Sequence, residues 1–248
     1  MNFKNLIEHL LASRPSLYRV AHSVRSFPNP DKLIFSKFIK KGDIVIDCGA
    51  NVGLYTNFIR SIVGKSGFVH AFEPIPSTFK NLQTNTKDYA SLNNYILNNL
   101  GLYKKRENLT AYIPDSIHGH ASLNNHISEW KSDSIEEVSI ELTTLDSYFS
   151  EKKLKKIDFI KMDIEGAELD ALEGGQQTLS EYTPTLHLEV NSKLLKNFKR
   201  APSDLFKFLK PLGYKKFYYY DANPKILSCF EQLLASNCNI NTNVVAEK

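Results

Sequence analysis

The chain has 248 residues, of which 42% are hydrophobic and 23% charged, and its formal net charge is +4. This composition is ordinary for a soluble globular protein, and the mild charge lacks the basic density of a nucleic-acid surface, so we expect no nucleic-acid partner. No apolar run approaches the roughly 20 residues that span a bilayer, so we expect no stable membrane insertion.

Residues 1–39 predict an N-terminal helical extension, interrupted by the prolines of the stretch FPNPDK. Residues 40–248 predict one domain, in which short apolar strands alternate with helices. The predicted strands cover residues 44–47, 68–74, 95–99, 157–162, 183–190 and 217–220. Four helices are predicted. The first has an apolar face over residues 54–62, and the second begins after the N-cap Ser77. The third spans residues 166–173 and is ended by Gly174 and Gly175, and the fourth begins near residue 203. Residues 103–142 predict hairpin-like strands and loops.

Strands that alternate with helices predict an α/β fold, with a mostly parallel sheet covered by helices on both faces. In such sheets the ligand binds beyond the carboxyl ends of the strands. Residues that directly follow each strand are therefore the first candidates for chemistry.

The first such junction is the turn DCGANVG after the strand at 44–47. Gly49 and Gly53 let the backbone pass close to a ligand, and the helix beyond them presents free N–H groups. Glu73 ends the next strand, where a carboxylate is placed to accept both hydroxyls of a ribose. Asp47 precedes the glycines and is suited to hold an ammonium group through the turn.

Three classes of ligand compete for this turn. A nucleoside triphosphate is disfavoured because the Gly-Lys-Ser/Thr ending of a phosphate-binding loop is absent. A dinucleotide is disfavoured because GANVG lacks the G-x-G-x-x-G spacing. S-adenosyl-L-methionine carries no phosphate and has an amino-acid end, and it suits the turn and Glu73 best.

A second cluster of acids lies in IKMDIEGAELDALEGG. Asp163 closes a strand and should stand at the ligand edge of the sheet. Glu165 and Glu168 lie at a helix start, where they indicate either helix capping or, with Asp163, a divalent metal site. Lys161 lies among apolar residues and needs a partner if buried, for which Glu165 or Glu189 would serve; a catalytic lysine stays an alternative.

Histidines supply a further set of candidates. His187 interrupts an apolar strand, where it is either a satisfied buried residue or a base near the transferred group. His118, His120 and His126 lie in a loop-like stretch without cysteine or acid at metal spacing, so we expect a substrate-facing loop and no metal. The three cysteines, which also lack metal spacing, indicate reduced thiols in a cytoplasmic protein.

Four strings occur in a characteristic order: VIDCGANVGLYT, VHAFEPIPSTFKNLQTN, LTTLDSYF and IDFIKMDIEGAELDALEGG. Over roughly residues 40–222 the chain resembles the FkbM-type family of S-adenosylmethionine-dependent methyltransferases. The resemblance implies a Rossmann-like sheet of seven strands with the last strand antiparallel. It also implies methyl transfer to oxygen, often a sugar or polyketide hydroxyl in bacterial glycan or natural-product assembly.

The resemblance also assigns roles by position. It implies that the cofactor is lined by Asp47, Gly49, Asn51 and Gly53, that Glu73 holds its ribose, and that Asn99 lies near its adenine. It places Asp163 and Glu165 near the transferred methyl group and the acceptor. Acceptor contacts are expected from residues 103–142.

The predicted function is therefore an O-methyltransferase that acts on a hydroxyl of a small molecule or glycan. Asp163 or His187 would take the hydroxyl proton, and Asp163 is preferred because it ends a strand at the ligand edge. A methyltransferase-like module that binds without catalysis stays open, as does a nucleic-acid methyltransferase. A homodimer is compatible with the sequence, which does not define the acceptor.

Overall fold

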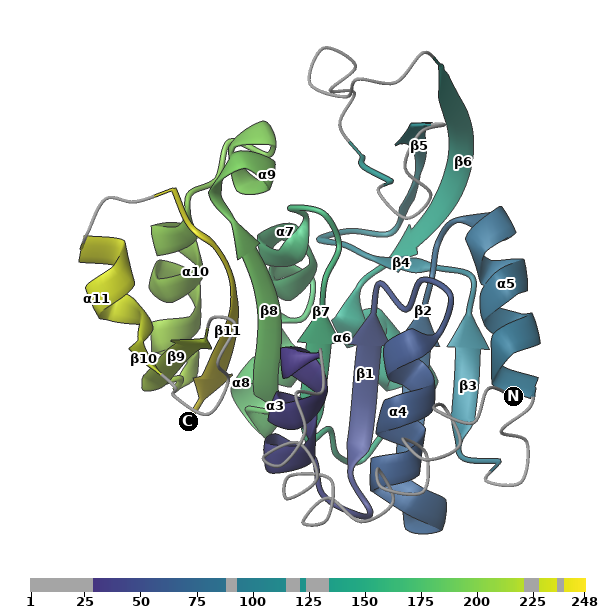
Figure 1. Cartoon of the computed structure of the whole chain (residues 1–248), viewed down its shortest axis with the longest axis horizontal. Helices are drawn as coiled ribbons and strands as arrows, with labels where there is room; N and C mark the ends of the chain where they lie inside the picture. Colours follow the sequence, from purple (N-terminus) through teal and green to yellow (C-terminus); the bar gives the residue numbers. More distant parts are fainter. Residues whose placement is uncertain (1–28, 88–92, 115–120, 124–133, 221–227, 236–238) are drawn as a thin grey trace.

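The computed structural model describes residues 29–87, 93–114, 121–123, 134–220, 228–235 and 239–248. Within these ranges the dominant element is an eight-stranded sheet with helices on both faces (Figure 1). From one edge to the other its strands are β10 (Ser228–Cys229), β9 (Lys216–Tyr220), β11 (Asn241–Glu247), β8 (Thr185–Asn191), β7 (Phe159–Met162), β1 (Ile44–Cys48), β2 (Phe68–Phe72) and β3 (Tyr95–Asn98).

The direction of the strands confirms the predicted fold class. Neighbouring strands from β3 through β2, β1 and β7 to β8 are parallel. The last strand, β11, inserts between β8 and β9 and is antiparallel to both. These are the seven strands of a Rossmann-like methyltransferase sheet, and the two-residue β10 extends its edge in the described part of the chain.

The helices were predicted less completely than the strands. In chain order they are α3 (Pro30–Phe38), α4 (Leu54–Val63), α5 (Pro76–Lys87), α6 (Leu145–Glu151), α7 (Glu168–Glu173), α8 (Gln176–Tyr182), α9 (Ser192–Asn197), α10 (Pro202–Leu209) and α11 (Phe230–Ala235), with short 3₁₀ turns η1 (Gly64–Ser66) and η3 (Lys210–Leu212). Ser77 is not an N-cap, because α5 already begins at Pro76, which suits a first helical position. Leu54, expected on a buried helix face, is 56% exposed.

A small second sheet corresponds to the segment predicted as hairpin-like. It consists of β4 (Gly101–Leu102), β5 (Glu107–Pro114) and β6 (Ile135–Thr143), with β5 and β6 antiparallel. Figure 1 shows β5 and β6 projecting beyond the end of the main sheet at which β1 and β2 finish. This placement puts the small sheet over the edge where ligands of α/β sheets bind.

The predicted N-terminal extension is described only from residue 29, and residues 1–28 lie outside the described ranges. Helix α3 packs on the main sheet, where the ring of Phe35 meets Phe159 of β7 edge-on at 5.9 Å. In the part of the chain that the structure describes, no helix is both long and apolar enough to cross a membrane.

Candidate functional site

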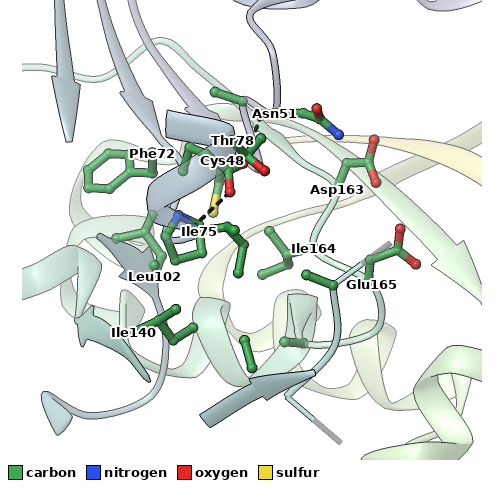
Figure 2. Close-up of a pocket in the computed structure, with 18 of the residues that line it drawn as sticks. Cys48, Asn51, Phe72, Ile75, Thr78, Leu102, Ile140, Asp163, Ile164 and Glu165 are labelled. Carbon is green, nitrogen blue, oxygen red and sulfur yellow. Dashed lines mark hydrogen bonds between the residues drawn. The ribbon is translucent and has the colours of Figure 1, made fainter. Parts of the chain in front are cut away.

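A cavity of about 1000 Å³ lies between the carboxyl ends of the main-sheet strands and the small sheet. Figure 2 shows two different walls. The carboxylates of Asp163 and Glu165 stand on one side, and the apolar side chains of Phe72, Leu102 and Ile140 on the other. The cavity can therefore hold a ligand with both a flat apolar part and a polar or charged part.

The glycine turn between β1 and α4 forms one border of this cavity. Gly49 has φ +75°, and a Cβ at this position would lie 1.9 Å from the carbonyl oxygen of Asp163. Its N–H and that of Ala50 donate to the Phe72 carbonyl at the end of β2, at 3.1 and 2.9 Å. Glycine is required here because three strand ends converge on one backbone turn and leave no room for a side chain.

Glu73 follows β2 and lies almost completely buried beside the turn. Its Oε2 accepts a hydrogen bond from the Asn51 backbone at 2.9 Å, and its Oε1 accepts one from the Ile75 backbone at 3.0 Å. Burial raises the pKa of Glu73, and these two amides act in the opposite direction. Each oxygen keeps a lone pair, so the carboxylate can accept further hydrogen bonds from a ligand in the cavity.

A buried ion pair lies beneath the turn. Lys161 Nζ is 3.4 Å from Asp47 Oδ1, with side-chain exposures of 2% and 0%. Lys161 also donates to the Gly49 carbonyl at 2.7 Å, and Thr56 donates to Asp47 Oδ2 at 2.6 Å. The pair therefore ties β1, β7, the glycine turn and the first turn of α4 together.

The partners of Lys161 differ from those predicted. Besides Asp47, the ammonium lies 3.7 Å from Asp163 Oδ2, and neither acid was expected in this role. Burial lowers the pKa of Lys161, but the charges of Asp163 and Asp47 more than offset this effect and leave the pKa raised. Lys161 is thus a cation at neutral pH, and its side chain also reaches the cavity wall.

The loop after β7 is held by Glu168, whose side chain is buried. Its Oε1 accepts hydrogen bonds from the backbone of Ile164 at 2.9 Å and of Gly166 at 3.2 Å, which matches the capping interpretation. Burial raises the pKa of Glu168 to about 7. Among the residues that the structure describes, no group of three or more His, Cys, Asp or Glu is arranged to bind a metal ion.

The family model of the methyltransferase FkbM domain matches residues 47–216. The chain belongs to the FkbM methyltransferase family. The matched region includes the turn, Glu73 and the end of β7, where Lys161 and Asp163 lie.

Two curated relatives of this FkbM-family protein are named methyltransferases. Methyltransferase 1 of Beauveria bassiana (strain ARSEF 2860) is 27% identical over 144 residues, which cover 52% of this chain and 57% of that protein. The 2-O-methyltransferase NoeI of Sinorhizobium fredii (strain NBRC 101917 / NGR234) is 41% identical over 58 residues, which cover 23% of this chain and 24% of that protein. The chain thus matches about half of the first relative and about a quarter of the second.

A solved structure shows the same fold. The FkbM methyltransferase from Methylobacillus flagellatus KT aligns with a TM-score of 0.54 at 16% identity, covering 98% of this chain and 59% of that chain. The predicted family and the predicted architecture are both confirmed.

The FkbM-family site does not bring all predicted residues to the cavity. Gly49, Asn51 and Glu73 line it, as do Asp163 and Glu165. Asp47 lies under the turn, in the ion pair with Lys161. The remaining cofactor candidates, Gly53 and Asn99, are not in the lining. Asn99 is exposed and donates to the backbone carbonyls of residues 73 and 74, so it shapes the Glu73 segment from outside.

His187 lies away from the cavity, buried beneath α3. Its Nε2 is 2.5 Å from the Tyr220 hydroxyl, which in turn donates to Asp31 of α3, and its Nδ1 has no hydrogen-bond partner within the described residues. Burial lowers the pKa of His187 to about 4. This placement gives it no contact with a ligand in the cavity, so the geometry does not support His187 as the base. His118, His120 and His126 lie outside the described residues.

Tyr55 and Glu189 are among the lining residues that were not predicted as site residues. Tyr55 of α4 lines the cavity, with the Lys161 ammonium 5.5 Å from its ring centre. Glu189 of β8 lines it beside Asp163. Asp163 was selected because ligands bind beyond the carboxyl ends of parallel strands. The same reasoning applies to Glu189, because both residues lie near the carboxyl ends of neighbouring parallel strands.

Proposed function

We propose that this FkbM-family protein is an S-adenosylmethionine-dependent O-methyltransferase that acts on a hydroxyl of a small molecule or glycan. The observation that carries the proposal is the buried Glu73 carboxylate beside the glycine turn. Each of its oxygens is fixed by one backbone amide and keeps a lone pair toward the cavity. Two adjacent hydroxyls of a ribose match two such acceptors.

The rest of the cavity suits the other parts of this cofactor. The apolar side chains of Ile75, Leu102 and Ile140 offer a surface for a flat base such as adenine. The turn at Gly49 offers close backbone contact for the amino-acid end, held in place from below by Lys161. Bound there, the cofactor supplies a methyl group activated by the adjacent sulfonium.

Oxygen as the accepting atom is supported by the acids on the opposite wall. Asp163 is 43% exposed at the cavity and sits beside the Lys161 cation, where its carboxylate can accept the proton of an acceptor hydroxyl. The name of the Sinorhizobium relative, a 2-O-methyltransferase, points to the same atom. Because Glu165 adds a further carboxyl group to this wall, a neutral sugar or alcohol fits better than an anionic acceptor.

The first experiment is calorimetric titration with S-adenosylhomocysteine, the demethylated product. We expect micromolar binding to the wild type and a loss of about 10- to 100-fold in Glu73→Gln, because a charged acceptor of ribose hydrogen bonds contributes about 1.5–3 kcal/mol. Glu141→Gln, on the exposed side of β6, serves as the matched control and should bind like the wild type.

The outcomes separate the parts of the proposal. Failure of the folded wild type to bind would refute the cofactor assignment, and equal affinity of Glu73→Gln would remove Glu73 from the ribose site. An assay of methyl transfer from S-adenosylmethionine to a panel of neutral glycosides then tests the acceptor class. The release of S-adenosylhomocysteine is the measured quantity. Binding without transfer to any hydroxyl would favour a non-catalytic module.

A further inference from the structure

Strands β7 and β8 run side by side to the cavity, where Asp163 directly follows β7 and Glu189 lies in the last part of β8. The last register pair is Met162 with Leu188, so Asp163 and Glu189 are the next residues along the two parallel strands. Both line the cavity. The carboxyl groups of Glu189 and Asp163 lie near enough to interact, and a hydrogen bond between them would require a proton on one of the two groups.

The charges around this pair are mostly negative. The groups that face Glu189 are Asp163 from β7, Glu165 from the following loop and Glu168 from α7, whereas its register neighbour on β11 is the neutral Asn243. The cation next to the pair is Lys161, 3.7 Å from Asp163 and 3.4 Å from Asp47. One ammonium already shared between two aspartates cannot also neutralise Glu189, and two adjacent carboxylates do not both ionise at neutral pH.

We propose that Asp163 and Glu189 form a carboxyl pair that holds one proton, and that protonated Glu189 is a positioning residue that orients the Asp163 carboxylate toward the acceptor hydroxyl. This inference rests on the proposed function for its catalytic meaning, but the pair itself does not depend on it. Burial, followed by the charges of Asp163, Glu168 and Glu165, raises the pKa of Glu189 to about 9, so Glu189 stays protonated over the neutral range.

The different roles of Asp163 and Glu189 follow from their exposure and from the charges around them. The Lys161 ammonium lies 3.7 Å from Asp163 and stabilises a negative charge there, and the Asp163 side chain is 43% exposed. As the acceptor oxygen bonds to the methyl carbon, the methyl–sulfur bond breaks and its electron pair stays on sulfur. The hydroxyl proton passes to the free oxygen of Asp163 and then to water, while Glu189 keeps its proton throughout. Ionisation of Glu189 would place two like charges together and push the more exposed Asp163 toward solvent.

The pair can be tested without an acceptor, by NMR titration of protein labelled with ¹³C at the glutamate carboxyl carbons. The resonance of Glu189 is identified by its absence in Glu189→Gln. Glu168→Gln identifies a second glutamate with a raised pKa, which titrates nearer pH 7. We expect Glu189 to titrate near pH 9 in the wild type. In Asp163→Asn its pKa should fall by about one unit or more, because the neighbouring charge is gone. An ordinary glutamate pKa in the wild type, or no change in Asp163→Asn, would overturn the pair.

Kinetics with a neutral glycoside that the wild type methylates then test positioning. Ionisation of Glu189 should make the wild-type kcat fall at alkaline pH. Glu189→Gln keeps a hydrogen-bond donor for Asp163 but cannot ionise, so its kcat should not fall at alkaline pH and should stay above that of Glu189→Leu. Glu189→Leu removes the donor and should lower kcat about tenfold or more, with little change in KM. Equal kcat in Glu189→Leu and wild type would refute positioning. Absence of S-adenosylhomocysteine binding would instead refute the proposed function and leave the titration result standing.

Discussion

Replacement of Lys161 by methionine tests the buried ion pair that supports the glycine turn. Methionine fills a similar volume but leaves the Asp47 carboxylate, which is fully buried, with the Thr56 hydroxyl on one oxygen and no cation for the other. Loss of one member of a buried pair destabilises proteins by about 3–5 kcal/mol. The lost 2.7 Å hydrogen bond to the Gly49 carbonyl adds about 1 kcal/mol. We therefore expect Lys161→Met to lower the free energy of unfolding by about 4–6 kcal/mol.

The assay is urea unfolding at pH 7, with comparison of midpoints at unchanged slope. Lys156→Met is the matched control, because Lys156 forms an exposed pair with Asp158 at 2.8 Å and should contribute less than about 1 kcal/mol. The double variant Asp47→Asn/Lys161→Met removes both charges and should recover a large part of the loss. A loss in Lys161→Met no larger than in the control, or full additivity in the double variant, would refute the argument.

Two further predictions concern buried titratable groups. The folded-state pKa of Glu168 is about 7 against an ordinary 4.5, so the folded state binds more protons between these values and stability falls as pH rises through this window. Glu168→Gln should remove this contribution, on the order of 3 kcal/mol, from the pH dependence of the free energy of unfolding. If the free energies of unfolding of variant and wild type differed by the same amount at every pH, the prediction would be wrong. His187→Asn should lower the melting temperature but keep both S-adenosylhomocysteine affinity and methyl transfer, because His187 lies outside the cavity. Selective loss of transfer at unchanged affinity would restore His187 as the base.

Most strands were predictable from the sequence because buried parallel strands are short apolar runs. Strand β11 was not predicted over residues 241–247. This segment has polar ends, and its insertion between β8 and β9 depends on contacts distant in sequence. The predicted helix stop at Gly174 and Gly175 is confirmed, since α7 ends at Glu173, and α8 begins directly after the two glycines. A Cβ on Gly174 would lie 2.1 Å from the Tyr103 carbonyl, so close packing against another segment, not only helix termination, requires glycine there.

The candidate site was partly predictable for the same geometric reason. Glu73 and Asp163 were selected because they follow parallel strands, and both line the cavity. The rule does not say which of two adjacent residues faces the ligand. At the end of β1, Cys48 lines the cavity whereas Asp47 points to Thr56 and Lys161 below the turn. Strand alternation reverses the direction of a side chain with every residue, so an error of one position exchanges a ligand contact for a structural one.

His187 and Glu189 show that the alternation of side chains along a strand does not determine how deep in the sheet a residue lies. They are two residues apart on β8 and therefore share a face, about 6–7 Å from each other along the strand. The register of the sheet separates them: His187 is level with Lys161, in the interior, whereas Glu189 is level with Asp163, at the edge. Depth along the strand thus decides that the histidine is buried beneath α3 and that the acid reaches the cavity. Since the register depends on pairing between β7 and β8, a base cannot be assigned from residue chemistry alone. Asp163, at the edge of the sheet, is a better candidate than His187, which lies level with Lys161 in the interior.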